Sequence, residues 1–356
     1  MAENILVLGG AGFIGSSLAI GLKTAHPEWQ ITCLDNLRRR GAELNLPRLK
    51  HLSIQFIHGD IRFLSDLDID ALGEAGTIID CSAESSVLAG VTSPQYVLQA
   101  NLLGTINILE LARRTRARLL FLSTNRVYSI PAIKSLKIME QPTRFALAPD
   151  QIVRGVTQAG INEQFTLRGH RSLYGATKLA SELLIEEYRQ MFQMSAIINR
   201  CGVVTGAWQM GKVDQGVFVL WMATHYFKKQ LSYIGFGGTG KQLRDLLHIS
   251  DLLRLVDYQL ANFADLDGEV FNVGGGETNT LSLFETTDLC QEITGNKIRI
   301  EATLAERPGD VAAFVTDNSK ITQATGWRPI TPPRASLEDI YYWIVNHEDK
   351  LRSVLL

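Results

Sequence analysis

A tyrosine and a lysine four residues apart form the first candidate catalytic pair. Tyr174 and Lys178 lie in the stretch SLYGATKLASELLIEEYRQMF, whose amphipathic pattern predicts a helix. Residues at this spacing project from the same helix face, one turn apart. A phenol has an ordinary pKa of about 10, and a nearby ammonium group favours its phenolate form. The pair can therefore transfer a proton, although Tyr/Lys pairs at this spacing are also common on solvated helix flanks.

Three glycines mark a candidate nucleotide site. Gly9, Gly12 and Gly15 follow the apolar run ILVL and precede a predicted helix. Glycines in this context let backbone amides approach a pyrophosphate at a helix N-terminus. Asp35 ends the next apolar run, where a carboxylate can accept hydrogen bonds from the adenosine ribose and repel a 2′-phosphate. The alternative is a glycine-rich turn that binds nothing.

Three consecutive arginines bear on the choice of cofactor. Arg38, Arg39 and Arg40 could bind a 2′-phosphate, but a charge run after a strand is more often a solvated loop. Asp60, after IQFIHG, is either a contact for the adenine or the cap of a turn. We expect NAD rather than NADP.

The elements that must position these residues alternate along the first 200 positions. Six apolar runs predict buried parallel strands: ENILVLG, QITCLD, IQFIHGD, TIIDCSA, RLLFLST and SAIINRCGVV. Helical patterns fill the gaps, as in NLLGTINILELARR. This alternation predicts an α/β fold with a Rossmann-type doubly wound parallel sheet. Thr124, at the end of RLLFLST, then lies at the carboxyl edge of the sheet, where ligands bind.

The chain divides into two expected domains. A cofactor domain over 1–205, with 246–276 returning to it through EVFNVGGG, is followed by a smaller mixed substrate domain made of 206–245 and 277–356. The stretch 129–171 has weak periodicity and scattered prolines, so we expect an insertion over the active site.

Composition excludes several functions. The 356 residues carry a formal net charge of −2, so no basic field would attract nucleic acid or anionic membrane. No apolar run approaches the roughly 20 residues that span a bilayer. The spacing of the four cysteines matches neither a disulfide framework nor a zinc site. We expect a cytoplasmic protein with reduced, buried thiols and no metal.

Together, the glycine loop, the strand ending in Thr124 and the Tyr174/Lys178 pair resemble the extended short-chain dehydrogenase/reductase family over nearly the whole chain. The resemblance implies that Tyr174 is the acid/base, that Lys178 holds the nicotinamide ribose and lowers the tyrosine pKa, and that Thr124 hydrogen-bonds the reacting sugar hydroxyl. It also implies NAD as cofactor and a homodimer formed by the helices that begin near Asn101 and Tyr174. The implied cofactor contacts are Gly9, Gly12, Phe13, Ile14, Gly15, Asp35, Asn36, Asp60, Ile61, Ser82, Ala83, Asn101, Tyr174 and Lys178.

The two residues after Thr124 discriminate between reactions. Related sugar-nucleotide 4,6-dehydratases typically place an Asp-Glu pair there for proton transfer during water elimination. This chain has Asn125 and Arg126, which supply neither acid nor base. The resemblance therefore favours a simple hydride reaction over a dehydration.

Later segments carry a finer resemblance. GAWQMGKVDQGVFVLW, YIGFGGTGKQLRDLLHISDL, STNRVY and RSLYGATKLASE are similar to the CDP-tyvelose (CDP-paratose) 2-epimerases. The implied substrate contacts are Thr124, Asn125, Lys212, Gln215, Arg244 and Arg307, with the two arginines on the diphosphate. The alternative is that these arginines pair with Asp245 and Asp310 as structural salt bridges.

Four further residues need an explanation. His170 and Ser129 depart from the family pattern, at positions where we expect a proline or small residue and a glycine. Trp208 and Trp221 could stack on a base or sugar, although aromatic residues in such runs more often belong to a core.

The sequence therefore predicts an NAD-dependent nucleotide-sugar epimerase, with a CDP-sugar 2-epimerase of polysaccharide biosynthesis as the leading hypothesis. A ketose would form by transient oxidation of the sugar carbon, turn in the pocket and be reduced on its opposite face. A UDP-sugar 4-epimerase shares the same catalytic set and remains open. A catalytically silent NAD-binding regulator or scaffold is the alternative from another class.

Overall fold

The computed structural model describes residues 3–67, 75–211, 215–307 and 309–355, which form two compact units. The first unit comprises 1–127, 172–200 and 253–271, and the second comprises 128–171, 201–252 and 272–356. The segment 128–171 thus groups with the second unit, whereas the expected domains placed it within 1–205.

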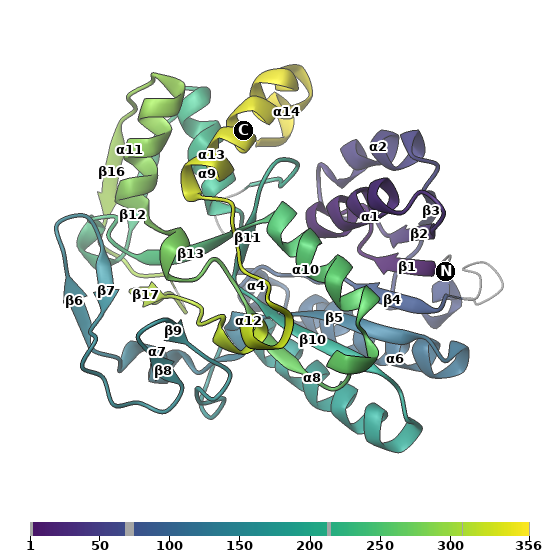
Figure 1. Cartoon of the computed structure of the whole chain (residues 1–356). Coiled ribbons are helices and arrows are strands. Elements are labelled where there is room, and N and C mark those ends of the chain that lie inside the picture. Colours follow the sequence, from purple (N-terminus) through teal and green to yellow (C-terminus); the bar gives the residue numbers. More distant parts are fainter. Residues whose placement is uncertain (1–2, 68–74, 212–214, 308, 356) are drawn as a thin grey trace. The chain divides into compact units, whose positions relative to one another are not determined.

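The first unit is built on a seven-stranded sheet (Figure 1). The glycine loop directly follows its strand β1, and Asp35 and Thr124 end two of its other strands. Its order is β14-β10-β5-β4-β1-β2-β3, and the pairings from β5 to β3 are parallel. All six apolar runs are strands of this sheet, and EVFNVGGG supplies the seventh. The strands are β1 (Asn4–Leu8), β2 (Gln30–Asp35), β3 (Gln55–His58), β4 (Thr77–Asp80), β5 (Arg118–Thr124), β10 (Ala196–Cys201) and β14 (Val270–Val273).

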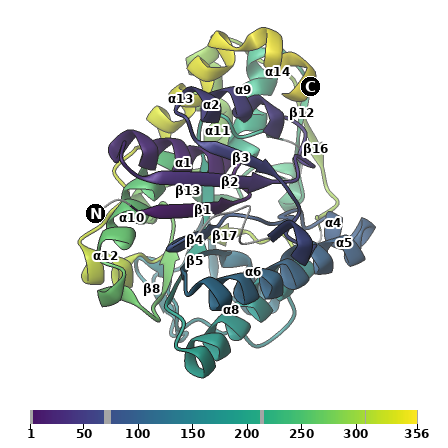
Figure 2. The ribbon, with the colours of Figure 1, turned by 90° about the vertical axis from the view of Figure 1, so that its right-hand side faces the viewer.

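Helices explain why the central strands are apolar throughout. All four residues of β4 are buried, as are all but the first of β5, because both sheet faces are covered. Figure 2 shows α6 and α8 side by side beside the sheet, and Gly21 of α1 packs against Leu253 of α10. The helices are α1 (Phe13–Ala25), α2 (Leu46–His51), α4 (Ala89–Thr92), α5 (Pro94–Leu98), α6 (Gly104–Thr115), α8 (Leu173–Phe192) and α10 (Ile249–Ala261).

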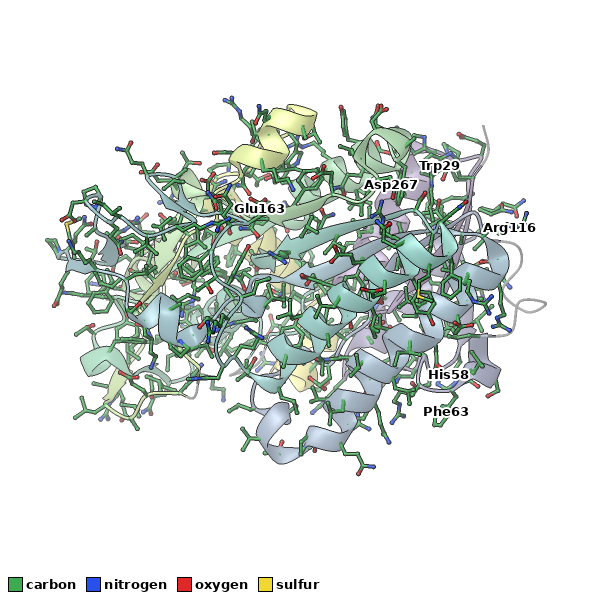
Figure 3. All side chains as sticks on the ribbon, turned by 90° about the horizontal axis from the view of Figure 1, so that it is seen from below. Trp29, His58, Phe63, Arg116, Glu163 and Asp267 are labelled. Atoms are coloured by element: carbon green, nitrogen blue, oxygen red, sulfur yellow. The ribbon has the colours of Figure 1, made fainter. Side chains whose placement is uncertain are left out.

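Helix α8, which carries the Tyr/Lys pair, is held at both ends. At its start the side chain of Ser172 accepts a hydrogen bond from the amide of Gly175, as N-cap residues commonly do. Near its end Arg189 pairs with Asp267, which also accepts the amide of Ala196 at 2.8 Å (Asp267 is labelled in Figure 3). The cap stabilises the first turn of the helix, and Asp267 links its last turns to the start of β10.

The second unit is built from short strands and a helical group (Figure 1). Its main sheet has the order β11-β13-β15, with β17 pairing β13, and three two-stranded sheets accompany it. Helices α9, α11 and α13 contact one another. The strands are β6 (Ile138–Glu140), β7 (Phe145–Leu147), β8 (Val156–Thr157), β9 (Gly160–Ile161), β11 (Val203–Thr205), β12 (Leu231–Ile234), β13 (Leu243–His248), β15 (Thr280–Ser282), β16 (Ile300–Thr303) and β17 (Ala313–Phe314). The helices are α7 (Ile130–Lys134), α9 (Val217–Tyr226), α11 (Leu283–Thr294), α12 (Ser319–Thr325), α13 (Pro333–Asn346) and α14 (Glu348–Leu355).

The insertion 129–171 belongs to the second unit because its hydrogen bonds join it to other segments of that unit. The amide of Ile161 donates to Val315, and the carbonyl of Ile161 accepts the amide of Asp317. Glu163, labelled in Figure 3, accepts the amide of Asn272 at 2.6 Å. The weak periodicity of this stretch reflects two short hairpins, β6–β7 and β8–β9.

Membrane-spanning helices and metal-ligand clusters were sought in the described residues. No helix there is long and apolar enough to cross a membrane, and no group of His, Cys, Asp and Glu side chains is arranged to hold a metal. None of the four cysteines, all of which are described, forms a disulfide, and burial raises the pKa of Cys33 and Cys290.

Candidate active site

The glycine loop connects β1 to α1 with a geometry that side chains would block. Gly9 has a φ of +72°, a conformation that L side chains rarely adopt, and a Cβ at Gly15 would overlap the carbonyl oxygen of Gly9. Helix α1 begins at Phe13 with no side-chain cap and no acidic residue in its first turn. Phe13 and Ile14 are half-buried in that turn. The amides there remain available for a pyrophosphate, so the loop fits a dinucleotide.

Asp35 ends β2 beside this loop. Its two carboxylate oxygens accept the amide of Ala11 at 3.1 Å and the amide of Leu37 at 2.8 Å. Burial raises the pKa of the Asp35 carboxyl, and these backbone hydrogen bonds offset part of the rise. Asp35 therefore fixes the loop as well as presenting a carboxylate where an adenosine ribose would lie.

A polar cluster follows β3. Asn36 donates to Asp60 at 2.9 Å, and Arg62 forms a salt bridge with Asp60 at 2.7 Å. Burial alone would raise the pKa of Asp60, but the hydrogen bonds from Arg62 and Asn36 outweigh it and hold the pKa below its usual value. Ile61 is buried, and its carbonyl accepts Asn107. The structure thus brings Asn36, Asp60 and Ile61 together at the neighbouring ends of β2 and β3.

The end of β4 contains a carboxylate that the sequence analysis did not single out. Asp80 is buried opposite Phe121 in the β4–β5 register, and it accepts the amide of Ser82 at 2.9 Å and its hydroxyl at 2.5 Å. Burial raises the pKa of Asp80, while the charge of Lys178 lowers it. The signal available in the sequence was an acidic residue ending an otherwise apolar run. Ala83, one of the implied cofactor contacts, is exposed in the segment that follows.

Asn101 connects the segment that follows β4, at Glu84, to helix α8 by hydrogen bonds. Its side chain donates to the carbonyl of Glu84 at 3.0 Å and to the hydroxyl of Thr177 at 3.1 Å, and it accepts the amide of Glu84. The hydroxyl of Ser181 donates to the backbone carbonyl of Asn101. Asn101 is therefore bonded on both sides of Lys178 in sequence, which makes it a positioning residue for that helix turn.

The amine of Lys178 is buried. It lies 3.7 Å from the ring centroid of Phe121, a distance typical of a cation–π contact, and the lysine is 2% exposed. Tyr174, one turn earlier, is only half-buried. A buried lysine next to an accessible phenol is an arrangement that can lower a tyrosine pKa and hold a ligand hydroxyl.

The turn after β5 contains Thr124, Asn125 and Arg126. Thr124 is buried at the strand end, and its hydroxyl accepts the amide of Arg126 at 3.2 Å. Asn125 and Arg126 are half-buried in a 3₁₀ turn. The turn itself therefore supplies a hydroxyl and an amide side chain but no carboxylate.

A buried ion pair behind this turn was also missed. Glu182, four residues after Lys178, pairs with Arg200 of β10 at 2.7 Å and accepts the hydroxyl of Ser123. Glu182 and Arg200 are both less than a tenth exposed. The pair joins α8 to β5 and β10, and its sequence signal was a glutamate at helical spacing on the buried face of α8.

The second unit contains the predicted diphosphate ligands. Arg244 of β13 pairs with Asp310 at 2.5 Å and donates to the carbonyl of Val311 at 2.8 Å. Asp245 does not take part in this pair, because its carboxylate accepts the amides of Gly276 and Thr316. The sequence left open a structural ion pair for each arginine with a neighbouring aspartate; Arg244 does form an ion pair, but with Asp310 and not with the adjacent Asp245.

Two other predicted substrate residues, Arg307 and Gln215, are half-buried in the second unit. Lys212 lies outside the described residues.

Residues that depart from the family pattern, or that were candidates for stacking, have local roles. Ser129 is buried and caps α7 by accepting the amide of Ala132, and His170 is exposed. Trp221 is buried in α9 and donates to Thr287. Trp208 packs edge-on against His347 at 4.8 Å. Both tryptophans have partners within the second unit.

Comparison with known proteins gives one family and several relatives. Residues 5–274 match the model of the NAD dependent epimerase/dehydratase family. The chain is 29% identical to the CDP-paratose 2-epimerase of Salmonella typhi over 96% of its length and 98% of the relative's. It is 25% identical to the dTDP-glucose 4,6-dehydratase of Salmonella typhimurium, covering 99% of this chain and 95% of that one.

Solved structures share the fold. The UDP-glucuronic acid 4-epimerase of Bacillus cereus, in complex with UDP-glucuronic acid and NAD, has a TM-score of 0.78 at 24% identity, covering 96% of this chain and 99% of that one. The UDP-glucose 4-epimerase of Thermotoga maritima has a TM-score of 0.77 at 23% identity, covering 97% and 99%. These likenesses confirm the Rossmann-type α/β architecture.

Proposed function

The chain belongs to the NAD dependent epimerase/dehydratase family, an enzyme family that acts with NAD, and on that premise we propose that it is a CDP-sugar 2-epimerase of the paratose/tyvelose type. NAD, when bound, supplies reversible oxidation of the sugar carbon. The protein's own residues bind the nucleotide sugar, move the hydroxyl proton and retain the ketose.

The observation that carries the proposal is the composition of the turn after β5. Thr124, Asn125 and Arg126 supply no carboxylate at the position where the related dehydratases place an acid and a base. A reaction that needs only proton transfer at one hydroxyl fits this turn, and a water elimination does not. The identity to the CDP-paratose 2-epimerase along 96% of the chain supports C2 as the carbon and CDP as the nucleotide.

The three catalytic residues have different roles in the proposed reaction. Tyr174 takes the proton from the sugar hydroxyl and later returns it, Lys178 lowers the tyrosine pKa and holds the nicotinamide ribose, and Thr124 orients the hydroxyl through a hydrogen bond. Burial of the Lys178 amine supports its role, because a charge in a low-dielectric site acts more strongly on its neighbours.

The proposal assigns the diphosphate to Arg244 and Arg307, with Gln215 and Lys212 as further substrate contacts. A firm grip on the diphosphate, remote from the reacting carbon, lets the sugar turn while the intermediate stays bound. The planar guanidinium of arginine suits phosphate oxygens.

A homodimer is part of the proposal. Leu98, Leu103 and Leu183 are 42%, 42% and 57% exposed, and they lie on α5, on the π-helical segment Gln99–Leu103 before α6 and on α8, which contact one another (Figure 2). Exposed apolar side chains on adjacent helices favour a protein interface. Light scattering after gel filtration tests this: the wild type is expected at twice the chain mass and Leu183→Glu at the monomer mass, whereas a monomeric wild type would refute the dimer.

The experiment that tests the function is proton NMR of the protein incubated with CDP-, UDP-, GDP- and dTDP-sugars, without added reductant. Inversion at C2 of a CDP-deoxysugar is the expected result. Inversion at C4 of a UDP-hexose would assign the alternative epimerase reaction. An absence of product with every sugar, despite bound NAD, would favour the silent binding protein.

A further inference from the structure

Two arginines lie over one aromatic ring near the end of β2. Tyr96, in α5, is half-buried, and the guanidinium carbon of Arg38 lies 3.9 Å from its ring centroid. The guanidinium carbon of Arg62 lies 5.0 Å from the same centroid. Both distances fall within the range of cation–π attraction. Phe63, which follows Arg62 in the chain, is labelled in Figure 3.

The two arginines differ in what else they contact. Arg62 is neutralised by Asp60, to which it donates through Nε and a terminal nitrogen. Arg38 is exposed, and in the part of the chain that the structure describes no carboxylate pairs with it. Its backbone amide donates to the Asn36 side chain at 3.0 Å. The Tyr96 ring is thus the contact that locates the Arg38 guanidinium.

Opposite signals for the cofactor lie three residues apart. Asp35 presents a carboxylate that favours the 2′-hydroxyl of NAD and repels the 2′-phosphate of NADP. An arginine soon after such a strand is a common ligand for that 2′-phosphate. The Asp35 carboxylate is fixed by the amides of Ala11 and Leu37. Of these two opposing groups, the Arg38 side chain is therefore the one whose position can change.

We propose that Tyr96 is a specificity-determining residue for the cofactor: its ring holds the Arg38 guanidinium and so leaves Asp35 to select NAD over NADP. Tyr96 acts through Arg38 and is therefore a positioning residue. When the ring is removed, Arg38 is free to meet a 2′-phosphate. The inference rests on NAD binding by the family and is independent of which sugar is the substrate.

A competition experiment tests the proposal without turnover. The full-length protein is dialysed against equal concentrations of NAD and NADP, and the bound nucleotides are separated and counted. For Tyr96→Ala the ratio of bound NAD to bound NADP should fall by about 2- to 30-fold, the range that a cation–π contact of this kind spans. Tyr96→Phe keeps the ring and should keep the wild-type ratio.

A double substitution separates the two residues. Arg38→Ala alone should change the ratio by less than about 2-fold, because Tyr96 already holds the arginine, and Tyr96→Ala with Arg38→Ala should return the ratio to the wild-type value. Tyr96→Leu retains apolar bulk in case the alanine variant does not fold. An unchanged ratio in Tyr96→Ala or Tyr96→Leu, or a fall that persists without Arg38, would overturn the proposal. Neither result bears on sugar turnover, so failure here is distinct from failure of the proposed epimerase function.

Discussion

In the first unit the candidate residues lie where strands end, whereas in the second unit Arg244 lies within a strand and is bonded to a side chain from another segment. Gly9, Asp35 and Thr124 follow or end β1, β2 and β5, so the backbone of the sheet brings them to one edge. Arg244 is the second residue of β13 and reaches Asp310. Strand-end positions therefore follow from topology alone, whereas the role of Arg244 depends on a partner that the strand pattern does not reveal.

Removal of the Tyr174 hydroxyl should have the largest effect on activity, and it tests the candidate residues of the first unit. Tyr174→Phe should lower kcat by about 10²- to 10⁴-fold, because the phenol hydroxyl that transfers the proton is lost. NAD binding should change little. An NMR time course with the sugar that the protein accepts measures kcat.

Tyr188→Phe is the matched control for Tyr174→Phe. It lies on the same helix, and its hydroxyl donates to Glu110 at 2.6 Å. We expect its kcat within about 2-fold of the wild type, well below the contribution of a catalytic proton transfer. Equal turnover in Tyr174→Phe and wild type would remove Tyr174 from the mechanism.

The next effect concerns how α8 is held against the sheet. Glu182→Gln removes the carboxylate charge that pairs with the buried Arg200, which should lower the free energy of unfolding by about 3–5 kcal/mol. Urea denaturation measures this. Glu301→Gln, which disrupts an exposed pair with Arg299, should cost less than about 1 kcal/mol. Similar losses in both variants would contradict the burial argument.

Substitutions at Arg244 and Asp310 test whether the arginine of the second unit binds substrate. Arg244→Gln should raise KM by about 10- to 100-fold, the loss expected when charge-assisted hydrogen bonds to a diphosphate are removed. Asp310→Asn also removes the ion pair but leaves the arginine, so KM should not rise. If both variants only lower stability and neither raises KM, the pair is structural and Arg244 does not bind substrate.

The smallest effect is a pH dependence at Asp245. Burial raises the pKa of this carboxyl above its unfolded value, and its Oδ1 lacks a hydrogen-bond partner among the described residues. The carboxyl therefore contributes stability below its unfolded pKa and loses that contribution as the pH rises through its folded pKa.

Asp245→Asn removes this titration and keeps an oxygen that can accept the amides of Gly276 and Thr316. Its melting temperature relative to the wild type should rise as the pH increases from 4 to 7. A difference that is constant over this range would contradict the raised pKa.

Prediction from sequence succeeded where periodicity and backbone geometry decide. The glycine loop, the six parallel strands and the helix of Tyr174 and Lys178 follow from local pattern, and the structure has each of them. The positive φ of Gly9 explains why that position carries a glycine.

Contacts between distant segments were not predictable in the same way. The pairing of Glu182 with Arg200, the burial of Asp80 opposite Phe121 and the stacking of Arg38 on Tyr96 depend on register between elements. The grouping of 128–171 with the second unit depends on hydrogen bonds such as that from Ile161 to Val315, which leave no periodic pattern in the sequence.

In the proposed reaction one sugar carbon is inverted by transient oxidation, and the hydrogen removed from that carbon is returned to it. Its most direct test is to run the reaction on a CDP-deoxysugar in D₂O and to examine C2 of the product by NMR. The expected result is inversion at C2 with the original hydrogen retained and no deuterium incorporated. Deuterium at the inverted carbon, or formation of a 4-keto-6-deoxy sugar by loss of water, would contradict it.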